Sequence, residues 1–157
     1  MIPLINKSLI QRLQIEAKTS LRKRKTYNFH KDFADPINRM LNAIEPGSYI
    51  RPHKHENPDK REVFLILTGK ALVVFFDENG KITSHTILSR EAENLGLEIP
   101  PKIWHALISL EEGTVVYEVK DGPYNPADDK NFASWAPEEG DGGCDEFLQC
   151  IRMKFGV

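Results

Sequence analysis

Between residues 38 and 120 the chain consists of short apolar runs divided by turn residues, and this pattern constrains the fold more than any other feature. Turn signals such as Asn79-Gly80 separate runs of strand-like composition. The expected strands lie within residues 40–44, 49–55, 63–67, 71–76, 81–88, 94–99, 104–109 and 114–120. Strands this short and this regularly spaced indicate an all-β sandwich or barrel. Several runs are apolar at successive positions, as expected for strands covered on both faces or lying at a subunit interface.

The segment before these strands predicts a helix. Ser8 can cap it, and Ile10, Leu13, Ala17 and Leu21 recur at spacings of three and four, which places them on one helix face. The basic run 22–25 follows. It fits either a phosphate-binding patch or, more commonly, a solvated helix end.

After Lys120 the composition shifts to proline, glycine and acidic residues over residues 121–143. Phe132 and Trp135 lie within this polar stretch, which indicates a segment held against the body of the protein. Residues 144–153 predict a closing helix. We therefore expect a single domain over 1–157, with a helix and lead-in to 37, a barrel over 38–120 and an extension over 121–157.

Charge and composition exclude several classes of protein. The 157 residues carry 21 basic and 23 acidic side chains, a formal charge of −2, so no electrostatic footprint for nucleic acid exists. No apolar run is long enough for a membrane span, and the N-terminus has no secretory pattern. We expect a cytoplasmic protein that contacts neither nucleic acid nor membrane, with Cys144 and Cys150 as reduced thiols.

Three of the five histidines fall where a metal site needs them. His53 and His55 are two apart and project from the same face of a strand. Glu62 begins the next strand, and a proline turn delivers His105 to the start of another. Taken alone, each of these residues is more commonly an ordinary polar residue of a strand. Together, three imidazoles and one carboxylate are the ligand set that suits Zn, Fe, Ni, Cu or Mn.

Side chains along a strand point alternately to its two faces, and this alternation indicates further residues for the same cavity. Tyr49 and Arg51 share parity with His53 and His55, so they line the cavity if the strand is regular, and otherwise pack at its end. Trp104 is a candidate for stacking on a sugar face, although packing is the commoner role of such a tryptophan. We take Tyr49, Arg51 and Trp104 as the candidate substrate-binding residues. Of the neighbours Tyr117 and Glu118, at most one faces inward, while His30 and His85 have no partner at useful spacing.

The histidine pattern resembles the cupin superfamily. Its first motif is matched at Gly47, His53, His55, Glu62 and Gly69, and its second at Pro100 and His105. Six residues, instead of the usual three or four, separate His55 from Glu62, which leaves Glu56 or Asp59 as alternative carboxylates. Lys102 stands where the motif has glycine, and Ser109 where it has asparagine. These two departures leave the ligands in place and question only the shape of the turn.

A closer resemblance is to the WbuC family of small cupin-fold metalloproteins. The matching segments, within about residues 20–143, are 39–43, 52–55, 62–65, 99–101, 104–105, 119–124 and 126–140. The last of these is a stretch that general cupins lack. The resemblance implies a cupin-type double-stranded β-helix, or jelly-roll barrel, around a divalent transition metal (Zn, Fe, Ni or Mn). It also points to gene clusters for O-antigen and other surface polysaccharides.

These features leave three hypotheses for function. In the first, the metal assists isomerisation, epimerisation or dehydration of a sugar or nucleotide sugar. In the second, the protein is an oxygenase that uses Fe, Ni or Mn to oxidise a small chelating substrate. In the third, the protein is a non-catalytic carbohydrate-binding module stapled by the metal. In each case we expect the partner to be a small molecule, with a sugar as the candidate. The apolar run 72–76 further predicts a homodimer, because an interface would cover it.

Overall fold

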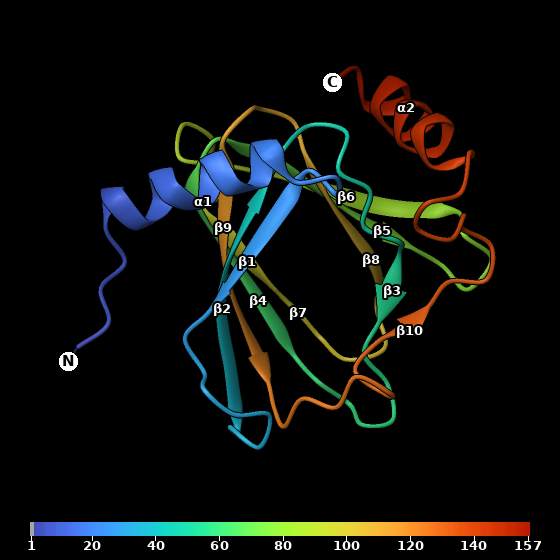
Figure 1. The fold of residues 1–157 in the computed structure, drawn as a ribbon. Helices are drawn as coiled ribbons and strands as arrows, with labels where there is room; N and C mark the ends of the chain where they lie inside the picture. Colours follow the sequence, from blue (N-terminus) through green and yellow to red (C-terminus); the bar gives the residue numbers. More distant parts are fainter. Residues whose placement is uncertain (1) are drawn as a thin grey trace.

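A computed structural model describes residues 2–157 of the chain (Figure 1). Two helices flank ten strands. In chain order the elements are α1 (Lys7–Thr19), β1 (Arg24–Asn28), β2 (Ile37–Ile44), β3 (His53–Lys54), β4 (Glu62–Thr68), β5 (Lys70–Phe76), β6 (Ile82–Ser89), β7 (Gly96–Ile99), β8 (Trp104–Ser109), β9 (Thr114–Asp121), β10 (Asn131–Phe132) and α2 (Cys144–Phe155).

The strands form two antiparallel five-stranded sheets. One has the order β1-β2-β9-β4-β7 and the other the order β10-β3-β8-β5-β6. Strands distant in sequence are neighbours in both sheets, as β2 with β9 and β3 with β8. The two sheets face each other around an apolar interior that includes Phe64, Val73 and Leu107. The expected all-β jelly-roll architecture, with an N-terminal helix and a C-terminal extension, is confirmed.

Helix α1 covers the outer face of the first sheet. Leu13 and Ala17 of the helix are fully buried against Leu41 and Val115 of the strands. Asn6, rather than Ser8, caps the helix, because the Asn6 side chain accepts a hydrogen bond from the Leu9 amide. Leu21 lies beyond the last turn and is fully exposed, so the predicted apolar face ends one turn early.

Helix α2 covers the outer face of the second sheet, on the opposite side of the molecule from α1 (Figure 1). Leu148 and Ile151 pack on the outward side chains of β5, whose inward side chains lie in the barrel core. The run 72–76 is therefore covered on both faces within one chain. The expectation that a partner subunit covers it is wrong, because α2 already occupies that face.

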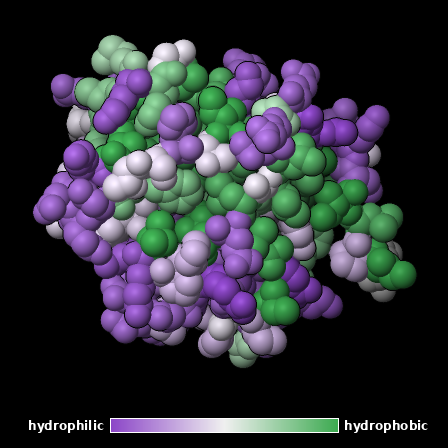
Figure 2. All heavy atoms as spheres, turned by 180° about the vertical axis from the view of Figure 1, so that it is seen from behind, coloured by the Kyte–Doolittle hydropathy of each residue, from purple (hydrophilic) through white to green (hydrophobic). Residues whose placement is uncertain are grey.

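The homodimer itself stays a prediction that no longer rests on β5. Seen from behind, hydrophobic side chains gather over the middle of the molecule within a hydrophilic border (Figure 2). Exposed large apolar side chains include Leu65 and Leu95.

Over residues 2–157 no helix has both the length and the apolar character needed to span a bilayer.

Strand boundaries agree with the sequence pattern except in three places. Residues 45–52 are not a strand, and only His53 and Lys54 of the segment 49–55 pair with neighbours. Strands β1 and β10 were not expected, since one is polar and basic and the other lies in the extension. Both are edge strands, where the burial that produces a recognisable apolar pattern is incomplete.

Candidate metal centre

Four side chains predicted as ligands meet at one end of the barrel, between the two sheets. His53, His55, Glu62 and His105 each offer a ligand atom, and all these atoms lie within 4.8 Å of one another. Each residue exposes 4% of its surface or less. Glu62 Oε2 lies 2.9 Å from His105 Nε2 and 3.5 Å from His55 Nε2.

Strand pairing explains this convergence. His53 in β3 is directly opposite His105 in β8, so their side chains emerge as a cross-strand pair. Glu62 begins β4 of the other sheet, which faces them. His55 follows β3, and its carbonyl accepts a hydrogen bond from the Lys102 amide at 3.1 Å. Lys102 adopts the left-handed conformation with φ of 69°, so the turn keeps the shape that glycine usually provides there.

Backbone carbonyls fix the orientation of the three imidazoles. His53 Nδ1 lies 2.9 Å from the Arg51 carbonyl, and His105 Nδ1 lies 2.9 Å from the Ile103 carbonyl. His55 Nδ1 contacts the Asp129 carbonyl in the same way. A carbonyl only accepts, so each Nδ1 carries a proton and each ring turns its Nε2 toward the centre.

This arrangement brings three imidazole nitrogens and a carboxylate together in a buried space. Although burial alone raises the pKa of Glu62, the surrounding imidazoles hold it well below its usual range, so the carboxylate is ionised. Burial lowers the pKa of His53 well below its ordinary value, which keeps that ring neutral. His55 Nε2 is buried without a hydrogen-bond partner among the described residues. Four convergent electron-pair donors with a single negative charge fit a divalent transition ion.

The two alternative carboxylates lie outside the cluster. Glu56 forms an ion pair with Lys54 at 2.9 Å, and Asp59 forms one with Lys102 at 3.1 Å. The longer loop after His55 therefore contributes no carboxylate to the centre, and Glu62 keeps the position that its spacing to Gly69 predicts.

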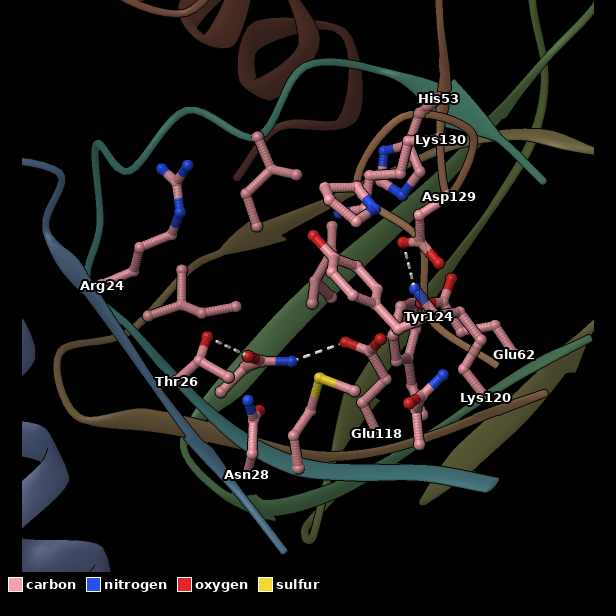
Figure 3. Close-up of a pocket in the computed structure, with 18 of the residues that line it drawn as sticks. Arg24, Thr26, Asn28, His53, Glu62, Glu118, Lys120, Tyr124, Asp129 and Lys130 are labelled. Carbon is pink, nitrogen blue, oxygen red and sulfur yellow. Dashed lines mark hydrogen bonds and ion pairs between the residues drawn. The ribbon is translucent and has the colours of Figure 1, made fainter. Parts of the chain in front are cut away.

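A cavity of about 520 Å³ opens beside the cluster (Figure 3). His53, Glu62 and His105 form part of its wall. Across from them, Thr26 donates to Asn42 at 2.6 Å, and Asn42 donates to Glu118 at 2.6 Å. The centre therefore opens onto a space whose wall combines amide, hydroxyl and carboxyl groups with apolar side chains such as Met40 and Phe64.

Glu118 is the inward-facing member of the pair Tyr117 and Glu118, as alternation requires. Tyr117 packs instead on the side of α1. Burial and the nearby Glu62 carboxylate raise the pKa of Glu118 to about 8. Alternation showed that only one of the two could face inward, but it could not show which face of β9 meets the cavity.

The C-terminal extension closes one side of this cavity. Asp129 is buried between two lysines, with Oδ1 3.0 Å from Lys60 Nζ and Oδ2 2.6 Å from Lys120 Nζ. Lys60 also donates to the Pro123 carbonyl at 2.7 Å. Tyr124 and Lys130 of the extension line the cavity directly (Figure 3). Sequence reasoning missed these residues, because acids and lysines in a polar stretch ordinarily indicate solvent exposure.

The three candidate substrate-binding residues do not line the cavity. Tyr49 is buried against Phe147 of α2, and its hydroxyl donates to the Pro137 carbonyl. Arg51 donates to the Ala133 carbonyl. Trp104 contacts Glu78 through its indole nitrogen. The parity argument for Tyr49 and Arg51 is wrong because the segment preceding His53 is not a strand.

The remaining polar residues that the sequence singled out have structural partners. Arg22 and Arg24 of the basic run line the far part of the cavity and both bind Glu139. His30 lies in the cavity wall with its Nδ1 next to the Arg39 backbone, and His85 stacks on Phe155. Both cysteines are free, as expected.

Comparison with solved structures identifies the fold. The capsular polysaccharide assembling protein CapF from Staphylococcus aureus is similar over 68% of this chain, with 24% identity and a TM-score of 0.56, but this chain covers only 28% of CapF. KdgF from Halomonas sp. is similar over 66% of this chain and 83% of its own, with 14% identity and a TM-score of 0.51. A recombinant oxalate oxidase in complex with glycolate is similar over 73% of this chain and 57% of its own, with 16% identity and a TM-score of 0.52.

These neighbours are cupin superfamily proteins, and the chain has their jelly-roll fold. Comparison with curated proteins finds no match. A family model described as a domain of unknown function (DUF6016) matches residues 5–88, which include α1, the first five strands and three of the four clustered side chains. Because that match covers more than half of the sequence, the chain belongs to the DUF6016 family.

Proposed function

We propose that this protein is a metal-binding cupin in which His53, His55, Glu62 and His105 bind one divalent transition ion. The observation that carries the proposal is the buried convergence of four ligand groups, in which Glu62 Oε2 lies 2.9 Å from His105 Nε2 while His105 Nδ1 faces the Ile103 carbonyl. Buried acceptors repel one another unless a cation or a proton lies between them. A metal ion satisfies all four groups at once.

We further propose that the cavity binds a sugar or nucleotide sugar and assists its isomerisation, epimerisation or dehydration. The ion supplies Lewis-acid polarisation of a carbonyl or hydroxyl oxygen. Glu118, on the cavity wall beside Glu62, is the group of this chain that exchanges a proton with the ligand through its carboxyl oxygen. Asn42 orients Glu118 by donating a hydrogen bond to its Oε2 atom.

Three observations support a hydroxyl-rich ligand from surface polysaccharide metabolism. Asn42 and Glu118 face the cavity with hydrogen-bonding groups, which suit hydroxyls better than an apolar molecule. The similar S. aureus protein is named for capsular polysaccharide assembly. The sequence resemblance to the WbuC family points in the same direction.

The second candidate function is oxidation of a small chelating substrate with oxygen. The similarity to an oxalate oxidase favours it, since that protein has the same fold. Oxygen uptake that depends on substrate, in protein containing Fe, Ni or Mn, would support this alternative. Zinc as the resident ion would contradict it.

Metal analysis of protein purified without a nickel column tests the proposal. We expect about one equivalent of a transition ion per chain, lost in His53→Ala and reduced in Glu62→Gln. Glu56→Gln is the matched control, because Glu56 lies two residues after Lys54 and pairs with it outside the cluster. Protein without stoichiometric metal, or Glu62→Gln with wild-type metal content, would contradict the assignment.

A further inference from the structure

We propose that the cavity takes an anionic ligand, a carboxylate or a phosphate, and that Lys130 is the residue that recognises its charge. This inference deepens the proposed function and rests on it, because the anion lies beside the metal centre. Nothing in the cupin motif includes Lys130, which belongs to the C-terminal extension.

The first step is that the extension has a fixed position. Asp129 is 4% exposed and its two carboxylate oxygens are taken by Lys60 and Lys120. Its carbonyl holds His55 Nδ1. The adjoining residues pair with β3 as strand β10, in which Phe132 lies opposite His53. The backbone on both sides of Lys130 is therefore attached to the metal centre.

The second step is that the Lys130 ammonium has no carboxylate of its own. Lys60 and Lys120 both form ion pairs with Asp129, whereas Lys130 has no ion-pair partner among residues 2–157. Lys130 lines the cavity and lies beside His53 (Figure 3). A lysine that is half-buried in a cavity wall without a counter-ion is a group that an anionic ligand would satisfy.

The third step is the charge balance of the centre. At the cavity end near the cluster, the wall contains the ammonium groups of Lys120 and Lys130 and the carboxyl groups of Glu62, Glu118 and Asp129. A third ammonium group, that of Lys60, lies outside the wall and is paired with Asp129. Even with every carboxyl ionised these charges cancel, so a divalent ion leaves an excess of two positive charges. At the far part of the same cavity, Arg22 and Arg24 share the single carboxylate of Glu139. Both parts therefore attract negative charge.

The fourth step is the chemistry of the ligand itself. A ligand whose acid group is adjacent to a hydroxyl group could place the hydroxyl near the metal ion. Its negatively charged acid group would then contact Lys130 Nζ. Tyr124, from the same extension, presents its hydroxyl to the cavity as a further hydrogen-bonding group (Figure 3). A neutral molecule of the same shape would leave the lysine without a partner in a partly desolvated space.

Calorimetric titration of the metal-loaded protein with matched probes tests this proposal. Glycolate is compared with its neutral isostere glycolamide, and methyl phosphate replaces the carboxylate by a phosphate. We expect glycolate or methyl phosphate to bind at least about tenfold more tightly than glycolamide, the range for a hydrogen bond to a charged group. The tighter of the two anions identifies the acid group that the site prefers, and either order supports the proposal.

Variants of Lys130 assign the effect. Lys130→Gln should lose about tenfold in anion affinity while keeping wild-type metal content and thermal stability, and Lys130→Arg should restore most of the loss. Lys81→Gln, which changes an exposed lysine of the β5–β6 turn, is the control and should bind as wild type. Metal content, measured on the same samples, separates the two proposals.

Equal binding of glycolate and glycolamide to metal-loaded protein, or wild-type affinity in Lys130→Gln, would overturn the anion proposal and leave the metal centre intact. Absence of binding by both anions with metal present would overturn it equally. Wild-type protein that takes up no metal would instead overturn the proposed function, and the present inference with it.

Discussion

Replacing Asp129 by asparagine should destabilise the metal-free protein by about 3–5 kcal/mol, the usual effect of removing one partner from a buried ion pair. The side chain is 5% exposed and each oxygen has its own lysine, at 3.0 Å and 2.6 Å. At an effective dielectric constant near 20, each contact has a gross attraction of about 5–6 kcal/mol, most of which offsets desolvation. Asparagine removes this attraction and leaves both ammonium groups buried.

The assay is urea unfolding of metal-free protein followed by the fluorescence of Trp104 and Trp135. For a chain of this length the expected loss corresponds to a fall in melting temperature of about 6–20 °C. Asp128→Asn is the matched control, because Asp128 is the neighbouring acid and its carboxylate contacts only Asn125 among the described residues. We expect the control to lie within about 0.5 kcal/mol of wild type.

The charge argument also predicts a rescue. Lys60 is fully buried, so Lys60→Met in the Asp129→Asn background removes one of the two uncompensated ammonium groups. The double variant should be more stable than Asp129→Asn alone. Asp129→Asn with the stability of Asp128→Asn, or a double variant that is less stable still, would refute the reasoning.

Three further predictions concern the surroundings of the site. Arg22 and Arg24 lower the pKa of Glu139 to about 2, so its contribution to stability is present above the ordinary carboxyl range and is lost as the pH falls toward 2. Since this carboxylate is partly exposed, Glu139→Gln should lower the free energy of unfolding by only about 1 kcal/mol at pH 7. The difference in urea midpoint between this variant and wild type should shrink by about half or more at pH 3. A difference that stays constant with pH would contradict this role of Glu139. Lys102 has a φ of 69°, so Lys102→Gly should have a free energy of unfolding within about 1 kcal/mol of wild type, whereas Lys102→Val should lose more. Equal urea midpoints for the two variants would exclude backbone strain at this position. Leu148→Ala should lower the free energy of unfolding in urea by about 2–5 kcal/mol without changing the metal content, because Leu148 is buried between α2 and the second sheet. Met153→Ala, at an exposed position of the same helix, should leave the free energy of unfolding unchanged. Loss of metal in Leu148→Ala would contradict the separation of α2 from the metal centre.

The ligand cluster could be predicted from the sequence because its geometry is local. His53 begins β3 and His55 directly follows it, so the two histidines face the same way, and Glu62 and His105 lie at or next to the first residue of a strand in the sheets. Such positions depend on strand period and turn placement, both of which leave a pattern in the chain. The unusual Lys102 did not disturb this pattern, because the backbone there adopts the glycine-like conformation with a lysine in place.

The cavity wall could not be predicted, since alternation gives parity and not orientation. In β9, Glu118 and Lys120 face the cavity while Tyr117 packs on the side of α1, the reverse of the usual assignment of charge to solvent. Tyr49 and Arg51 failed for a different reason, because parity has no meaning where residues 45–52 form no strand. Both errors arise from packing between distant segments, which a local pattern does not contain.

The C-terminal extension combines these two lessons. Phe132 and Trp135 predicted that it is held against the body of the protein, but its polar residues gave no sign that Asp129 is among the most buried acids in the described structure. Burying that acid is unfavourable unless Lys60 and Lys120 are already in place, and burying those lysines is unfavourable without the acid. The same residue supplies the carbonyl that orients His55. Docking of the extension and assembly of the metal centre therefore depend on each other, so metal loading should protect residues 121–143 from proteolysis, and Asp129→Asn should weaken that protection more than Asp128→Asn does.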